Sequence, residues 1–174
     1  MATATGWRIF LLTVCSLLAG CGLTQTVTDG TVNMTKAIFY KKIKILHLDL
    51  SPRAGINTDG AQTPLATMVW VYQLKDRKSV DTASYQTLLR NADAVLKDDL
   101  LASKSLLVMP QGSLTLNMPM DENAQFVAVV GLFNRPDMQN NTWRLVLSRN
   151  DLDPDKPRTI ELGNSGLSLV PIKE

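Results

Sequence analysis

The thiol of Cys21 is the side chain in this sequence whose neighbours point most directly to a chemical reaction. Leu18, Ala19 and Gly20 precede it, and together the four residues form the pattern of a lipobox. The small residues before the cysteine give a peptidase access to the bond, and the thiol can then carry a diacylglyceryl group. We therefore predict lipidation at Cys21, which would become the first residue of the processed chain.

The segment before the lipobox has the composition of a signal peptide. Arg8 supplies a positive charge, and an apolar stretch of about ten residues follows from Ile9 to Leu18. This stretch is shorter than the roughly 20 apolar residues that a membrane-spanning helix needs. The alternative is an ordinary cleaved signal peptide that ends at a cysteine by chance. We assign residues 1–20 to a lipoprotein signal peptide.

The residue after the cysteine bears on the destination of the anchored protein. Gly22 stands at this position, where an Asp commonly retains lipoproteins at the inner membrane of Gram-negative cells. We therefore expect the lipid-anchored protein to lie at the periplasmic face of the outer membrane. Each buried methylene of an acyl chain contributes about 0.8 kcal/mol, and two or more chains hold a protein stably on the lipid surface.

Charge and cysteine content argue against several classes of function. The chain of 174 residues has 18 basic and 16 acidic residues, and Arg8 is the only charged residue in 1–20. Such a near-neutral balance gives no electrostatic case for binding nucleic acid. The two cysteines are Cys15 and Cys21. No thiol therefore remains in the processed domain to form a disulfide.

The remaining polar residues do not assemble a catalytic or metal-binding pattern. His47 is the only histidine, so a zinc-type site is not predicted. The run Asp151, Asp153 and Asp155 lacks the glycine and glutamate of a calcium-binding EF-hand loop, and we interpret it as a solvated turn. The chain has no Gly-x-Ser-x-Gly motif and no phosphate-binding glycine-rich loop. We expect a protein that is not an enzyme and needs no cofactor or metal.

The chain after the signal peptide divides into a tether and one domain. Residues 21–40 comprise the lipidated N-terminus and a segment rich in Thr, Asn and Gly, which is typical of a flexible tether. Residues 41–174 are long enough to form a single domain with its own core.

Most of the domain has strand patterns. Apolar and polar residues alternate from Ile43 to Leu50, and the phase slips between Ile45 and Leu46, which predicts a bulge. The other predicted strands are separated by Pro, Gly, Asn and Asp residues. They are Met68–Leu74, Leu106–Met109, Leu114–Met118, Phe126–Phe133, Trp143–Leu147, Thr159–Leu162 and Leu167–Val170.

One segment, Ser84–Leu101, has helical spacing instead. Asp81 is a possible N-cap, and Asn91 to Asp93 could divide the segment into two short helices. The order of elements predicts a mainly β fold, a two-sheet antiparallel β-sandwich with a short helical insertion after the second strand. We expect core positions for Trp70 and Trp143, and packing roles for Met109, Met118 and Met120.

Two connections are long for a compact domain, and such loops are usually functional or mobile. The first, Ser51–Ala66, contains several Pro, Gly, Asn and Asp residues. The second, Asn134–Thr142, contains Pro136 and the pair Asn140-Asn141. We give the first loop the stronger case for a function.

The order of these features resembles the TssJ (SciN/VasD) family of lipoproteins of the type VI secretion system. The likeness covers nearly the whole processed chain, although no single motif is unique to the family. It is carried, after the lipobox and tether, by Ser51-Pro52, Asn57, Gly60, Pro64-Leu65, Val71 to Asp76, Tyr85 to Leu89, Leu96 to Leu101, Pro110 with Gly112, Phe126 to Phe133, Trp143-Arg144 and Ile160 to Leu162.

The resemblance implies a transthyretin-like β-sandwich held by its lipid at the outer membrane. It also implies a structural role: the loop between the first two strands would bind the periplasmic C-terminal region of the inner-membrane protein TssM, in a complex that includes TssL. In this chain the matching loop is Ser51–Ala66. We predict that Arg53, Ile56, Asn57 and Asp59 contact the partner.

Two other functions remain open at this stage. A pilotin-like lipoprotein chaperone would escort a pore subunit to the outer membrane. A periplasmic ligand-binding β-sandwich would need a concave site with exposed aromatic residues.

Overall fold

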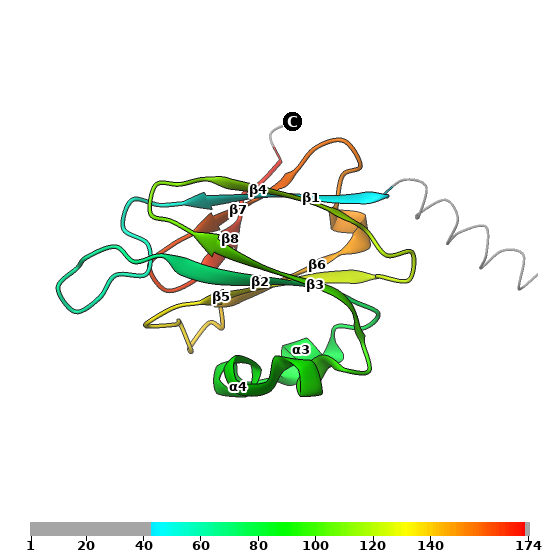
Figure 1. Ribbon diagram of the computed structural model, residues 1–174, viewed down its shortest axis with the longest axis horizontal. Coiled ribbons are helices and arrows are strands. Elements are labelled where there is room, and N and C mark those ends of the chain that lie inside the picture. The colour runs from blue at the N-terminus through cyan, green and yellow to red at the C-terminus, as the bar shows by residue number, and fades with distance from the viewer. Residues whose placement is uncertain (1–42, 173–174) are drawn as a thin grey trace, which may run out of the picture. The chain divides into compact units, whose positions relative to one another are not determined.

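The computed structural model describes residues 43–172, which form two packed β-sheets with two helices outside them (Figure 1). Each sheet has four strands, in the orders β4-β1-β7-β8 and β3-β2-β5-β6. The strands are β1 (Ile45–Pro52), β2 (Thr67–Leu74), β3 (Leu100–Val108), β4 (Leu114–Pro119), β5 (Phe126–Leu132), β6 (Arg144–Ser148), β7 (Arg158–Leu162) and β8 (Leu167–Leu169). The predicted β-sandwich is confirmed, while residues 1–20 and 21–40 lie outside the described part.

The sheets are antiparallel except for one pair. β1 runs parallel to β7, and its other neighbour, β4, is antiparallel. The bulge predicted between Ile45 and Leu46 is wrong, because the register with β4 is continuous from Ile45 to Leu50. Ile45 faces outward and Ile43 is buried just before the strand begins. The apparent phase slip in the sequence therefore arises because Ile45, an apolar residue, is exposed at the start of the strand.

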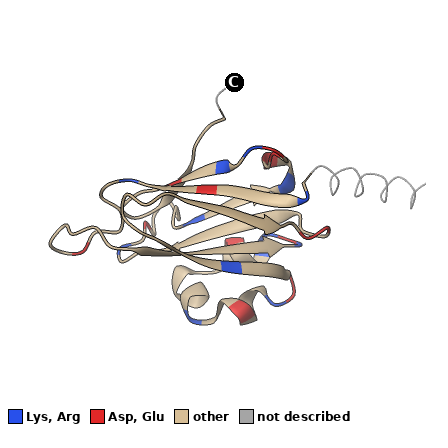
Figure 2. Cartoon of the chain, turned by 45° about the horizontal axis from the view of Figure 1, so that its top comes forward, with Lys and Arg blue, Asp and Glu red and all other residues tan. Residues whose placement is uncertain are grey.

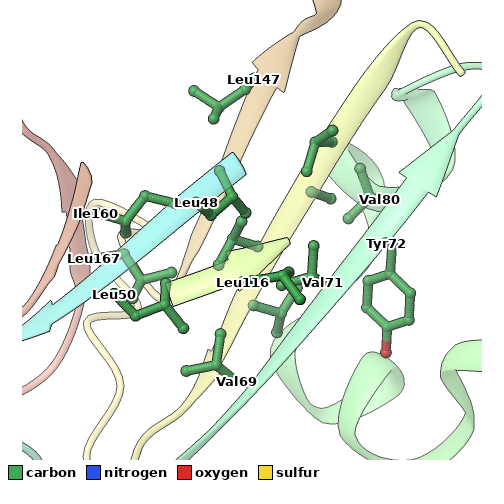
Figure 3. Packing of buried hydrophobic residues seen from close by; sticks show 14 of the residues in the cluster. Leu48, Leu50, Val69, Val71, Tyr72, Val80, Leu116, Leu147, Ile160 and Leu167 are labelled. Atoms are coloured by element: carbon green, nitrogen blue, oxygen red, sulfur yellow. The ribbon is translucent and has the colours of Figure 1, made fainter. Parts of the chain in front are cut away.

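The core lies between the two sheets and consists of alternate residues of their strands (Figure 3). Leu46, Leu48 and Leu50 of β1 are fully buried, as are Val69 and Val71 of β2. Burial of each such side chain contributes about 1.5–3 kcal/mol. This alternation fixes the register of both strands, because a shift by one residue would turn the apolar face to solvent.

The helical insertion covers the outer face of the β2-containing sheet (Figure 1). It consists of α3 (Lys78–Thr82) and α4 (Tyr85–Leu96), and α4 is kinked at Asn91 as predicted. The predicted N-cap is wrong: Ser84 caps α4 by accepting a hydrogen bond from the Thr87 N–H at 3.1 Å, whereas Asp81 lies within α3. The residues after Lys97 do not continue the helix, because Leu100 begins β3.

Two buried polar side chains fasten the fold at the end where β1 begins. Gln73 of β2 donates to the Pro119 carbonyl of β4 and accepts from the Asp121 N–H, both at 2.8 Å, and so links the two sheets. Arg149, in the short 3-10 helix η1 (Arg149–Asp151), donates to the carbonyl of Ile43 at 2.9 Å. The start of the described chain is thereby held against the sandwich.

The tryptophan predictions hold to different degrees. Trp143 is fully buried just before β6, whereas Trp70 is only partly buried on the helix-covered face of β2. Basic and acidic residues are interspersed over the strands and connections (Figure 2).

Candidate functional site

Four connections meet at one end of the sandwich, which we call the loop end. Pro52, the last residue of β1, pairs with Leu162, the last residue of β7. Thr67, the first residue of β2, pairs with Val108 at the end of β3. The β1–β2 connection extends beyond both sheets there (Figure 1). The loop end comprises residues 53–66, 109–113, 133–143 and 163–166.

The base of the β1–β2 loop is part of the core. Ile56 is fully buried, and its carbonyl accepts a hydrogen bond from the Leu65 N–H at 3.3 Å, which closes the loop. Asn57 is also buried and has a positive φ of 48°. Its side chain donates to the Ala66 carbonyl at 3.2 Å and accepts from the Asn134 N–H. These two residues set the shape of the loop.

Thr58 joins the same loop to the β7–β8 turn. Its backbone N–H and its hydroxyl both donate to Oδ1 of Asn164, at 2.7 and 2.8 Å. The Asn134 side chain also donates to the Thr58 carbonyl, at 3.4 Å. Three connections that are distant in sequence are therefore linked by hydrogen bonds, and the loop end is preorganised.

The Asp59 side chain holds the backbone at the tip of the β1–β2 loop. Its Oδ1 accepts hydrogen bonds from the N–H groups of Ala61 and Thr63, at 2.8 and 2.9 Å. The hydrogen bond from Thr63, with that from Ala61 and the charge of Arg135, holds the pKa of Asp59 below its usual value. The residues beyond Asp59, from Gly60 to Leu65, are exposed and form the true tip.

Arg53 lies on the surface at the start of the loop. Its guanidinium forms an ion pair with Glu161 of β7 at 2.5 Å, and its side chain is 67% exposed. Of the four residues predicted to contact a partner, Arg53 and Asp59 thus lie at the surface, and Ile56 and Asn57 are buried. Their roles as contacts stay predictions.

The second long loop packs against the β7–β8 turn. Asp137 accepts hydrogen bonds from Gln139, Asn140 and Thr142, and the bond from the Asn140 backbone is the main cause that lowers its pKa. Gly166 lies so close to Thr142 that a Cβ at this position would collide with the Thr142 hydroxyl. Only glycine fits this contact.

Several large apolar side chains remain exposed around the loop end. Leu65 is 37% exposed, Met109 55% and Met138 53%. The packing role predicted for Met109 is wrong, because it follows β3 in a turn at the surface; Met120, by contrast, is buried. Leu65 was named only for the family resemblance, and Met138 was not singled out, because isolated apolar residues in loops carry no periodic signal.

Exposed apolar side chains and polar loop residues therefore occur together at the loop end. Protein interfaces combine the same two kinds of residue, and Met is common in them. Within residues 43–172, no group of three or more His, Cys, Asp or Glu side chains could hold a metal ion. No helix in the same part of the chain is long and apolar enough to cross a membrane. Cys21, the predicted lipidation site, lies outside the described residues.

Comparison with known proteins extends this description. A family model for type VI secretion lipoproteins (VasD, EvfM, TssJ) matches residues 44–165. A chain in a structure named "Type VI membrane complex" is 45% identical, with a TM-score of 0.72, and the match covers 75% of this chain and 100% of that one. No curated protein matches this chain.

Two further structures are similar. A chain in a structure named for the TssM C-terminal domain from EAEC is 44% identical over 75% of this chain and 100% of that one, with a TM-score of 0.69. The lipoprotein TssJ1 from Pseudomonas aeruginosa is 22% identical over 76% and 98%, with a TM-score of 0.64, and supports the fold alone. Because the model of the TssJ (SciN/VasD) family matches residues 44–165, the chain belongs to this family of type VI secretion lipoproteins.

Proposed function

We propose that this lipoprotein is anchored in the outer membrane and binds the periplasmic C-terminal domain of TssM through its loop end. It would thereby tie an inner-membrane protein of the type VI secretion system to the outer membrane, within a complex that includes TssL. The observation that carries the proposal is the preorganised loop end with its exposed Leu65, Met109 and Met138.

The comparisons support TssM as the partner. A chain 44% identical to this one belongs to a structure named for the TssM C-terminal domain, and another, 45% identical, to a structure named for the membrane complex. A lipoprotein-like chain in a structure named for TssM is what a complex of the two proteins would contain. Identity at this level over the whole matched chain supports the same partner here.

The geometry of β1 suits a connecting role. The strand begins at Ile45, next to the segment that leads from Cys21, and ends at Pro52 in the loop end. Eight residues at about 3.3 Å per residue place the loop end roughly 25 Å from the start of the strand. The tether predicted from the sequence would leave the loop end free to reach a partner in the periplasm.

The four predicted contact residues would then have two roles. Arg53 and Asp59 would lie at the interface, because both reach the surface. Ile56 and Asn57 would act indirectly, by holding the tip from Gly60 to Leu65 in place. A role in assembly needs no nucleophile or general base, and we propose that the protein is not an enzyme.

A calorimetric titration of the full chain in detergent against the TssM C-terminal domain tests this function. The informative variant replaces only Gly60–Pro64 with a Gly-Ser linker, since Ile56 belongs to the core and must stay. We expect saturable binding for the native chain and none for the variant, with unchanged thermal unfolding. Equal affinity of both would refute the loop end as the site. Binding to a pore subunit in place of TssM would favour the pilotin-like alternative.

A further inference from the structure

A cavity of about 320 Å³ lies between α4 and the outer face of the β2–β3 strand pair, away from the loop end. Its floor is formed by Trp70 and Tyr72 of β2 and by Ser105 and Ser103 of β3, which pair with them and therefore share their face. Its wall is the segment of α4 from Leu88 to Asp93. The volume is at the lower end of the range of about 300–1,000 Å³ for small-molecule sites.

Tyr72 is the residue that most needs explanation in this cavity. It is only 5% exposed, and its hydroxyl points toward the helical segment (Figure 3). A buried tyrosine hydroxyl usually finds a hydrogen-bond partner. No hydrogen bond within the described residues involves this hydroxyl, and it is not one of the fully buried polar atoms, so it is open to the cavity. Burial, with the nearby charge of Asp93, raises the pKa of Tyr72 to about 12, so the group is a neutral donor.

The rest of the lining has both aromatic and mixed polar character. Trp70 is partly buried and packs edge to face with Tyr72 at 6.3 Å between ring centroids, so part of its ring remains available. Arg90, Lys104 and the two serines can donate hydrogen bonds, and Asp93 and the serines can accept them. The kink at Asn91 lies in the same wall and interrupts the helical backbone there.

We propose that this cavity is a binding site for a saccharide unit, of the size of a mono- or disaccharide. Sugar hydroxyls both donate and accept hydrogen bonds, which matches a lining that offers both. The apolar face of a pyranose ring fits against the Trp70 indole. A purely apolar ligand would remove the Tyr72 hydroxyl and the two serines from water without giving them hydrogen-bond partners, and that is costly.

Ligand-observed saturation-transfer NMR on the full chain in detergent tests the site, with chitobiose and cellobiose as probes. We expect at least one probe to give transfer signals and a measurable affinity. Tyr72→Phe removes only the unpaired hydroxyl and should weaken binding roughly fivefold. Trp70→Leu should abolish it. Tyr85→Phe is the matched control, because Tyr85 is also buried but its hydroxyl donates to the Phe133 carbonyl outside the cavity.

Two results would overturn the proposal. One is the absence of transfer signals for both probes at millimolar concentration. The other is an affinity unchanged by both Tyr72→Phe and Trp70→Leu in folded protein, with folding checked by the amide spectrum. The site lies apart from the loop end, so titration with TssM is unaffected by either outcome and tests the proposed function separately.

Discussion

The side-chain oxygen of Asn57 accepts a hydrogen bond from the backbone N–H of Asn134 at 2.5 Å, and this contact joins the two long loops of the domain. Asn57 holds a positive φ of 48° there, which asparagine tolerates better than most residues. One residue thus fixes both the backbone turn and the contact between the loops. The proposed recognition surface depends on this arrangement, because the exposed tip from Gly60 to Leu65 follows directly after Asn57 and its neighbours.

Asn57→Ala should lower the free energy of unfolding by about 1–3 kcal/mol, because it removes two partly buried hydrogen bonds and strains the backbone. Urea unfolding measures the loss. Asn57→Gly is the control, since glycine relieves the backbone strain but still lacks the side chain. If Asn57→Gly were as stable as the native protein, the hydrogen bonds to Asn134 and Ala66 would contribute nothing.

Gly166→Ala should destabilise the domain by roughly 1–3 kcal/mol, because its Cβ would collide with the Thr142 side chain. Gly55→Ala has no atom within 4 Å of its new Cβ and should be close to neutral. Thermal unfolding of the two variants compares a crowded and an open glycine of the loop end. Equal melting temperatures would contradict the close approach of the two connections.

Arg149→Met should cost about 2–5 kcal/mol of stability. The buried guanidinium donates to the carbonyls of Ala124 and Ile43, which the variant would leave without these donors. Arg53→Met removes an arginine whose ion pair is exposed, and should cost less than about 1 kcal/mol. Chemical denaturation of the Arg149→Met and Arg53→Met variants measures both losses of stability. A small loss of stability for Arg149→Met would show that the hydrogen bonds of Arg149 to the Ala124 and Ile43 carbonyls are dispensable.

Asp137 should make the loop end sensitive to acid. Its pKa is lowered in the folded state, chiefly by the hydrogen bond from the Asn140 N–H, so its carboxylate stabilises the fold above the unfolded value of 3.8. This contribution is lost as the pH falls through the folded pKa. Melting temperatures measured from neutral to acidic pH should fall less steeply below about pH 4 for Asp137→Asn. Identical slopes would exclude this aspartate as a cause.

The position of β1 was predictable because buried and more exposed residues alternate along it, whereas β5, with five consecutive buried residues, was predictable from its apolar run. The wrong predictions concern segments where the local sequence pattern favours one structure and tertiary contacts favour another. Leu100 and Leu101 continue an apolar series from α4 yet join β3, since pairing with β2 outweighs helical spacing. Asp81 resembles an N-cap in sequence, but Ser84 occupies that position.

The candidate site was predictable only in outline. Loop length identified the β1–β2 connection, but the positions of the buried Asn57 and Thr58 depend on hydrogen bonds to Asn134 and Asn164, about eighty to a hundred residues away. No local pattern contains such contacts. The saccharide cavity depends in the same way on the pairing of β3 with β2 and on the position of the α4 kink.

The central claim, that the loop end binds TssM, is tested most directly by one pair of substitutions. Leu65 and Leu89 are similarly exposed, at 37% and 41%, but Leu65 lies at the loop tip and Leu89 on α4. Calorimetric titration of the TssM C-terminal domain should show an affinity at least about tenfold weaker for Leu65→Asp and unchanged for Leu89→Asp. Unchanged binding for Leu65→Asp, or loss only with Leu89→Asp, would contradict the account.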